Sequence, residues 1–405
     1  MEASDGSGDP RTAQAAALML AFAARTGLAD GRAPRRYLWT DAFAVCNFLA
    51  LARATGQRPY RDLALRLVEQ VHHTLGRHRA DDARRGWISG LSAAEGASHP
   101  TRGGLRIGKP LPERAPGEPF DAGLEWERDG QYFHYLTKWM HALDQVSRAT
   151  RDPRFTAWAR ELDARACAAF VATPGAGAPR MCWKMSIDLA RVLVPSMGQH
   201  DPLDGLVTTL QLRATAAACG AGTEAPDLAG EARRYAAIAA RGDWQTDDPL
   251  GIGGLLCDAF RLAQLERAGA TVDAALSPRV LDAARAGLDD YAAAAPLQAP
   301  PERRLAFREL GLAIGLHALA LMAQRCPDGD AGRRETVAAL ARHAALAARI
   351  ESDWLDPAHR EAASWQAHRD INEVMLATCL IPGGFVLLAP LQPTRRPTGA
   401  RIVRS

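Results

Sequence analysis

The stretch from Leu124 to Leu143, LEWERDGQYFHYLTKWMHAL, places a charged segment directly before an aromatic and apolar helix. Glu125 and Asp129 belong to the charged segment, and His134 and Tyr135 fall in the first turns of the helix. A surface helix usually carries its polar residues along one face rather than at one end. We therefore expect the start of this helix to open into a cleft and the remainder to be buried.

The rest of the chain also has the sequence pattern of helices. Alanine and leucine dominate, and no run alternates with period two, which favours helix almost throughout. Amphipathic segments with one charged face cover 11–26, 58–76, 153–171, 226–240, 276–294 and 331–350. Segments that are apolar or small nearly all round cover 39–54, 129–149, 201–218, 248–268, 305–325 and 369–381. The two kinds alternate strictly along the sequence.

The alternation predicts an inner and an outer layer of helices, because a helix that is apolar on all sides belongs in an interior. An Arg-Ala-Thr turn occurs at 53–55 and again at 148–150, and each copy is followed by an aromatic residue at the same offset. Six hairpins of this kind predict an all-α fold, an (α/α)6 barrel over residues 10–385, with flexible termini at 1–9 and 386–405. A superhelical stack of hairpins also fits the periodicity.

The connections that lead into the inner helices are long, above all those between Gly76 and Asp129 and between Phe170 and Asp201. Long loops gathered on one face of a compact scaffold commonly carry the binding site. We therefore expect the site at the N-terminal ends of the six inner helices.

Composition narrows the class of protein further. The chain has 405 residues, of which 47% are hydrophobic. Its formal charge of +3 is too small to indicate binding to nucleic acid or to an anionic membrane. The apolar run 15–24 follows acidic residues, which is the wrong polarity for a secretion signal. The seven cysteines are widely spaced and form no zinc pattern. We expect a cytoplasmic protein with reduced thiols; the oligomeric state is left open.

Aromatic residues gather at the predicted mouth of the barrel. Six of the nine tryptophans precede or begin inner helices or lie in the longest loop: Trp39, Trp87, Trp126, Trp183, Trp244 and Trp365. Flat rings around a cleft suit stacking on the apolar faces of sugar rings. The alternative is that these rings fill the junctions between loops and barrel.

Carboxylates converge on the same mouth: Asp41, Glu125, Glu127, Asp129, Asp201, Asp204, Asp247, Asp248, Asp370 and Glu373. Cleavage of a glycosidic bond needs one protonated carboxylic acid and a second carboxylate that activates water or attacks the sugar. Asp201, Asp248 and Asp129 also occupy positions where an aspartate caps a helix. Asp41 follows the better cap Thr40 and is therefore freer for chemistry.

Further polar residues complete the predicted site. His134 and His368 are candidate general acids or bases, although a buried histidine satisfied by a neighbour is the more common case. Gln131 and Tyr135 are expected to contact substrate. Arg128 and Arg369, with Lys109 in the longest loop, have the chemistry to hold a substrate carboxylate.

Motifs for cofactor or metal chemistry are missing from the sequence. It contains no HExxH, no GxSxG in a hydrolase context, no dinucleotide-binding GxGxxG and no Cys/His set for zinc. The expected site uses acid–base residues alone, with no cofactor and no metal.

The chain resembles the six-hairpin glycosidase-like superfamily. The resemblance rests on the sixfold hairpin plan, the Arg-Ala-Thr turns, and the helix starts at 39–41 and 126–131. Similar members include unsaturated glucuronyl hydrolases, for which Asp41 and Asp129 are the matching acid/base positions. Another similar group is the N-acylglucosamine 2-epimerases, which are expected to use two histidines. His368 suits one of them, but inner helix 248–268 opens without a histidine.

These observations lead to an expected function. We expect a carbohydrate-active enzyme, a glycoside hydrolase that uses Asp41 and Asp129, with Glu125 in reserve, on a neutral or anionic sugar or short oligosaccharide. His134 and Tyr135 would orient the substrate, and the tryptophans would stack on it. The alternatives are a sugar epimerase or isomerase acting through His368, and a non-catalytic helical protein that binds a ligand or protein partner.

Overall fold

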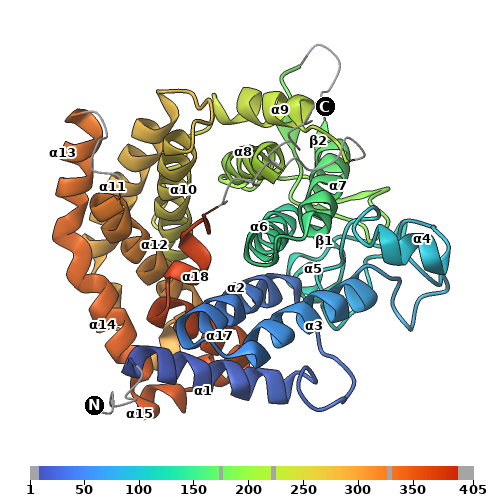
Figure 1. The fold of residues 1–405 in the computed structure, drawn as a ribbon, viewed down its shortest axis with the longest axis horizontal. Helices are drawn as coiled ribbons and strands as arrows, with labels where there is room; N and C mark the ends of the chain where they lie inside the picture. Colours follow the sequence, from blue (N-terminus) through green and yellow to red (C-terminus); the bar gives the residue numbers. More distant parts are fainter. Residues whose placement is uncertain (1–8, 173–176, 220–224, 326–330, 391–405) are drawn as a thin grey trace, which may run out of the picture.

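The computed structural model describes residues 9–172, 177–219, 225–325 and 331–390, and these residues are mostly helical (Figure 1). The predicted flexible segments 1–8 and 391–405 lie outside the described residues, as does Cys326. Asp9 is ordered as the N-cap of the first helix, where its side chain accepts hydrogen bonds from the N–H groups of Arg11 and Thr12.

The predicted helices all have counterparts. Six are buried along most of their length: α2 (Leu38–Thr55), α6 (Phe133–Thr150), α8 (Asp201–Cys219), α10 (Pro249–Arg267), α12 (Ala306–Arg325) and α17 (Arg369–Leu380). The half-exposed helices are α1 (Pro10–Arg25), α3 (Arg58–Leu75), α7 (Pro153–Phe170), α9 (Ala229–Ala239), α11 (Leu276–Ala294), and the pair α13 (Ala331–Leu340) and α14 (Ala344–Leu355). The 3-10 turn Ala341–His343 joins that last pair.

The six buried helices contact one another in a cyclic order. In chain order each packs against the next, from α2 through α6, α8, α10 and α12 to α17, and α17 packs back against α2. The half-exposed helices cover this series from outside: α1 on α17, α3 on α2, α7 on α6, α9 on α8, α11 on α10 and α14 on α12 (Figure 1). The two helices α8 and α17 are thus three steps apart in either direction.

Small residues allow two of these helices to approach closely. A Cβ atom on Gly253 of α10 would lie 2.1 Å from the carbonyl oxygen of Gly311 in α12, and Gly315 is similarly crowded by Gly253. Backbones can meet at this distance only where side chains are absent. The small-residue pattern of 248–268 and 305–325 therefore reflects helix packing.

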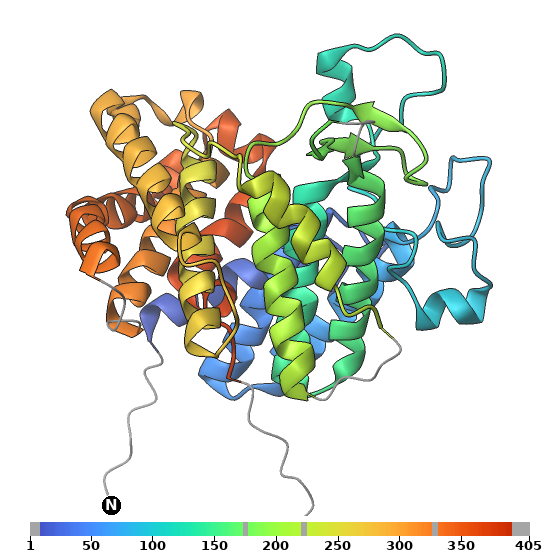
Figure 2. The same cartoon turned by 90° about the horizontal axis from the view of Figure 1, so that it is seen from above.

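Long connections lie at one end of the inner helices. They contain α4 (Ala93–Ser98), α5 (Ala122–Glu127) and a small sheet in the order β1 (Gln131–Tyr132), β4 (Lys184–Met185), β5 (Val192–Val194). A second pair is β2 (Val171–Ala172) with β3 (Arg180–Met181). Figure 2 shows α5 and the strands β4 and β5 together at the upper end of the helices. The sequence contains no alternating run, so these strands were not predicted.

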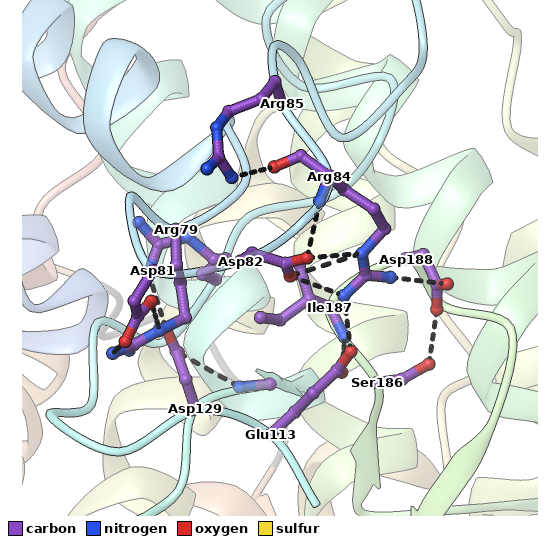
Figure 3. A network of polar contacts seen from close by, with 12 residues as sticks. Arg79, Asp81, Asp82, Arg84, Arg85, Glu113, Asp129, Ser186, Ile187 and Asp188 are labelled. Atoms are coloured by element: carbon purple, nitrogen blue, oxygen red, sulfur yellow. Dashed lines mark hydrogen bonds and ion pairs between the residues drawn. The ribbon is translucent and has the colours of Figure 1, made fainter. Parts of the chain in front are cut away.

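A polar network joins two of the long connections. Arg84 donates to Asp82, to Glu113 and, at 2.9 Å, to Asp188 of the second connection (Figure 3). Glu113 in turn accepts the backbone N–H of Ile187. Because several charges share these contacts, the network holds the two connections against each other more firmly than an isolated surface pair would.

The C-terminal segment folds back against the inner helices. Helix α18 (Gly383–Val386) contacts α2 and α10, and its carbonyl groups accept hydrogen bonds from Gln145, Gln264 and His141. The backbone N–H of Leu388 also donates to Gln264 at 2.9 Å. Residues 386–389, which fall in the predicted tail 386–405, thus have hydrogen bonds to Gln145, Arg148 and Gln264 of the inner helices.

Other boundaries differ in smaller ways. Helix α6 begins at Phe133, four residues after the predicted start at Asp129, because β1 occupies the intervening residues. The short helices α15 (Pro357–Arg360) and α16 (Ala363–Ala367) precede α17, and the 3-10 turns Pro296–Gln298 and Pro301–Arg303 precede α12. By length and composition α12 could cross a membrane, but 67% of its apolar window is buried inside the protein, which is typical of a core helix.

Candidate functional site

A cavity of about 1110 Å³ lies at the N-terminal ends of the six inner helices. Every inner helix contributes a lining residue from its first turns: Asp41, His134, Asp201, Leu250, Phe307 and Asp370. Phe43 and Phe385 line the inner end, where their rings stack with centroids 4.1 Å apart. The cavity is thus open at the long loops and closed at α18, and its size suits a small organic ligand.

Aromatic rings form part of the cavity wall. Trp39, Trp126 and Trp183 line the cavity, and Trp126 is 47% exposed, with its ring edge-on to Trp183 at 4.8 Å. Tyr37 and Tyr135 also line it, and their hydroxyl oxygens are 2.5 Å apart. An exposed indole beside paired hydroxyl groups offers both an apolar face and hydrogen-bonding partners.

The other three predicted mouth tryptophans do not line the cavity. Trp87, Trp244 and Trp365 are all buried. Trp365 stacks on Trp354 with centroids 5.6 Å apart, and the guanidinium of Arg279 lies over Trp244. These three rings fill junctions between helices and loops, so the expectation that Trp365 contacts substrate is not met.

Asp41 lines the cavity, but both of its oxygens have protein partners. Oδ1 lies 3.3 Å from Arg36 Nη1 in a buried ion pair, and Oδ2 accepts the backbone N–H of Tyr37 at 2.9 Å. Burial raises the pKa of Asp41 to about 6, while the Arg36 charge acts in the opposite direction. Asp41 therefore stabilises the backbone at the start of α2 in addition to lining the cavity.

Asp129 is fully buried and does not line the cavity, which corrects the expectation that it faces Asp41. Its Oδ2 accepts hydrogen bonds from Arg106 and, at 3.3 Å, from Arg79 (Figure 3). Its Oδ1 accepts the backbone N–H groups of Gly108 and Gly130, each at 3.0 Å. All of its lone pairs are directed into the loop, where it holds the backbone in place.

Glu125 is also occupied by structural partners. It belongs to α5 and is buried, and it pairs with Lys184 Nζ at 2.8 Å and with Arg114 Nε at 3.0 Å. Neither Glu125 nor these two cations lines the cavity. The predicted reserve carboxylate thus ties α5 to β4.

Two further predicted substrate-binding residues face away from the cavity. Gln131 is buried and donates from Nε2 to the carbonyl oxygens of Gly103 and Ile187. Arg128 forms an ion pair with Glu118. Both stabilise the loop layer around the cavity.

His134 lines the cavity as expected, in a fixed orientation. Its Nδ1 accepts a hydrogen bond from the indole N–H of Trp183 at 3.3 Å and lies 3.9 Å from Asp201 Oδ1. Burial lowers the pKa of His134 to about 3, so the ring is neutral near pH 7. With Nδ1 as the acceptor, the neutral ring carries its proton on Nε2, and it can donate to a ligand.

His368 and Arg369 also line the cavity, at the start of α17. Arg369 Nε donates to Glu373 at 2.8 Å. In the part of the chain that the structure describes, the His368 ring has an edge-to-face contact with Phe307 and no side-chain hydrogen bond. Burial, followed by the charge of Lys109, lowers the pKa of His368 below its usual 6.5, so this imidazole is a neutral base without a protein partner.

Asp201 is the carboxyl group whose environment is most suited to proton transfer. It lines the cavity at the start of α8, and its Oδ2 is buried without a hydrogen-bond partner in the described structure. Burial, and then the charge of Asp204, raises the pKa of Asp201 to about 7. Near neutral pH this group both donates and accepts a proton readily.

The helix-capping interpretation of the aspartates is not supported. The Asp201 side chain makes no hydrogen bond to the first turn of α8, and Asp248 makes none to α10. Asp248 instead pairs with Arg308 at 2.9 Å. The sequence signal that singled out Asp41 and Asp129, a polar residue at the start of an inner helix, applied equally to Asp201.

The deeper polar residues of the cavity neutralise one another. Lys138 Nζ lies 2.7 Å from Asp204, and Arg261 Nη1 lies 3.0 Å from Asp258 and 3.5 Å from Asp204. A buried ion that is paired and hydrogen-bonded is stable in its charged form. These four residues therefore form a compensated layer beneath the unpaired groups.

His200, directly before α8, was not predicted as a site residue. It lines the cavity, and its Nε2 bonds the carbonyl oxygen of Trp244 at 2.9 Å. Within the described residues no group of three or more His, Cys, Asp and Glu side chains could hold a metal ion.

Comparisons with known proteins add a distant likeness. No protein-family model and no curated protein matches the chain. The crystal structure of a sugar epimerase from a ruminal bacterium aligns with the chain at a TM-score of 0.44 and 10% sequence identity. The alignment covers 85% of this chain and 87% of that chain. A likeness at 10% identity assigns no role to a residue of this chain.

Proposed function

We propose that the protein is a sugar epimerase or isomerase, in which His368 and Asp201 move a proton at the carbon next to the carbonyl group of a reducing sugar. The proposal rests on the position of these two groups at the cavity and on their lack of hydrogen-bond partners. Both line the cavity, and neither the His368 imidazole nor Asp201 Oδ2 has a hydrogen-bond partner among the described residues. They begin α17 and α8, which occupy opposite positions in the cyclic order of inner helices.

The architecture supports a two-sided reaction. We infer that the six hairpins form an (α/α)6 barrel, because their inner helices contact in a closed series and their N-terminal ends all line one cavity. In such a barrel, groups on opposite helices approach opposite faces of a bound sugar. Inversion at carbon requires removal of a proton on one face and its return on the other.

The proposed reaction balances as follows. Neutral His368 takes the proton from the carbon, and the electron pair of the C–H bond moves to the carbonyl oxygen, which gives an enediolate. Protonated Asp201 then donates a proton to the opposite face of the carbon, and the carbonyl re-forms. Each acid–base group has a pKa suited to its task, since one is neutral and the other titrates near pH 7.

Sugar recognition is assigned to the aromatic wall. The exposed Trp126 would stack on the apolar face of the ring, as aromatic side chains do in carbohydrate sites. The Nε2–H of His134 and the hydroxyl groups of Tyr37 and Tyr135 would bind sugar hydroxyl groups.

Glycoside hydrolysis, the function expected first from the sequence, has less support in this geometry. The predicted pair is not assembled, because Asp129 is buried in the loop layer and Asp41 is held by Arg36. A hydrolase would have to use Asp201 as the general acid with another cavity carboxylate such as Glu127. A non-catalytic binding protein would leave the sugar chemically unchanged.

Incubation with reducing sugars in deuterated water distinguishes these functions. An epimerase or isomerase incorporates one deuteron from solvent at the carbon next to the carbonyl and forms a second sugar, both of which NMR detects. Release of a glycosyl group without incorporation would support hydrolysis instead. Binding without either change would support a non-catalytic protein.

A further inference from the structure

The cavity contains a set of basic side chains that are almost all neutralised by protein carboxylates. Six of them have an acidic partner within ion-pairing distance: Arg25, Arg35, Lys138, Arg261, Arg308 and Arg369. These pairs leave the basic groups with little spare charge for a ligand. One lysine or arginine of the cavity lining has no such partner among the described residues.

Lys109 is that exception. It lines the cavity, and among the described residues it has no carboxylate within ion-pairing distance and no side-chain hydrogen bond. Its ammonium group lies over the ring of Tyr37, 5.7 Å from the centroid. Burial lowers the pKa of Lys109, whereas the negative charges of Glu127 and Asp129, which lie beyond ion-pairing distance, raise it. The group is half-buried without a compensating partner, which is an unfavourable position for a charge.

The backbone beneath Lys109 is held firmly. Its carbonyl oxygen accepts a hydrogen bond from Arg79 Nη1 at 2.7 Å, and the preceding Gly108 N–H donates to Asp129 at 3.0 Å. Arg79 and Asp129 belong to the polar network of the long loop (Figure 3). Asp129, which the sequence suggested as a catalytic acid, instead helps to position the segment that carries Lys109.

The charge of Lys109 acts on one of the two proposed acid–base groups. The charges of Lys109 and Glu127 both act on His368. Lys109 lies over Tyr37, the residue directly before α2, and α2 packs against α17, the helix that follows His368.

We propose that Lys109 binds an anionic substituent, a carboxylate or a phosphate, on the sugar that the cavity receives. This inference rests on the proposed sugar-processing function and adds the charge of the substrate to it. A compact ammonium group suits either anion as a point charge, and a hydrogen bond between charged partners is stronger than one between neutral partners. The ligand thus supplies the partner that the protein does not.

Three sugars that differ at one carbon test the proposal: D-glucose, D-glucuronate and D-glucose 6-phosphate. We expect wild-type protein to bind at least one of the two anionic sugars about tenfold more tightly than glucose in isothermal titration calorimetry. The Lys109→Met variant should lose that factor for the preferred anionic sugar and change less than about twofold for glucose. Lys109→Arg should retain most of the preference, and Arg58→Gln, on the exposed face of α3, is the charge-removal control.

Two results would overturn the proposal. One is equal binding of all three sugars by wild-type protein. The other is a fall in kcat of the same size for neutral and anionic sugars in Lys109→Met, which would place Lys109 at the reacting atoms instead. Preference for glucuronate identifies a carboxylate, and preference for the phosphate ester identifies a phosphate. The binding measurement remains decisive if no sugar is turned over, so failure of the proposed reaction is distinguishable from failure of the anion site.

Discussion

The rings of Phe43 and Phe385 stack at an interplanar angle of 15°, which joins the second turn of α2 to the C-terminal helix α18. Both residues line the cavity, so this contact forms its closed end. The same short helix supplies carbonyl oxygens to His141 and Gln145 of α6. The C-terminal segment is therefore part of the core, and removing its anchor should have measurable consequences.

Replacement of Phe385 by alanine should lower the free energy of unfolding by about 3–5 kcal/mol, because the side chain is 5% exposed and a large void would remain. Chemical denaturation monitored by circular dichroism provides the measurement. The replacement of Leu20, which is 47% exposed on α1, serves as the control and should change stability by less than about 0.5 kcal/mol. A Phe385 variant as stable as the control would show that α18 does not stabilise the packing of the inner helices.

Replacement of Asp129 by asparagine should destabilise the protein by about 3 kcal/mol, because it leaves the buried cation Arg106 without its counter-charge. Denaturation and limited proteolysis in the loop 77–131 would report the change. Asp62→Asn, which removes an exposed partner of Arg58, should cost less than about 1 kcal/mol. Loss of activity with unchanged stability in Asp129→Asn would instead restore the catalytic interpretation of this residue.

The helical layers were predictable because they depend on local periodicity. The segment 58–76 was predicted from Tyr60, Leu67 and Val71 on one face, and these residues are buried in α3. Hydrophobic spacing of this kind is set by helix geometry and survives in any tertiary context.

The assignment of single polar residues was less predictable, because their partners are distant in sequence. The two cations that bind Asp129 come from 23 and 50 residues away, so local sequence could not show that this carboxylate is occupied. For Asp201 the local sequence misled in the other direction, because it suggested a carboxylate occupied by helix capping. An Asp-Pro start is a strong cap signal, but the Asp201 side chain makes no hydrogen bond to the helix N–H groups, and the residue lines the cavity. For both Asp129 and Asp201, the tertiary surroundings determine the contacts of the carboxylate, and the local helix-start signal does not.

Two tryptophans that looked alike in the sequence should respond oppositely to replacement by alanine. Trp126→Ala should weaken sugar binding about tenfold with little change in stability, since its ring is exposed in the cavity. Trp365→Ala should lower the free energy of unfolding by about 3–5 kcal/mol, since its ring is buried against Trp354. Calorimetric titration and denaturation of both variants check this. Similar binding losses in two equally stable variants would contradict the distinction.

The pH dependence of kcat/KM should have two limbs. Activity should fall about tenfold per pH unit above about 7, where Asp201, with its raised pKa, loses the proton it must donate. It should also fall at a pH below 6.5, where His368 becomes protonated and ceases to act as a base. Steady-state rates between about pH 5 and 9 measure both limbs.

A control is available for the alkaline limb. Asp163 also has a pKa raised to about 7 by burial, but it lies among Thr209 and Tyr235 outside the cavity. Asp163→Asn should leave the limb in place. Activity that stays constant to about pH 9 would count against Asp201 as the proton donor.

The proposed epimerisation depends most on the separate tasks of His368 and Asp201. The direct test follows deuterium exchange from solvent, by NMR, at the carbon next to the carbonyl in each of the two sugar epimers, using His368→Asn and Asp201→Asn. Each variant retains one proton-transfer group, so we predict that each loses epimerisation but still exchanges the proton of one epimer, and that the two variants exchange different epimers. Exchange of the same epimer by both variants, or epimerisation undiminished in either, would contradict the proposed mechanism.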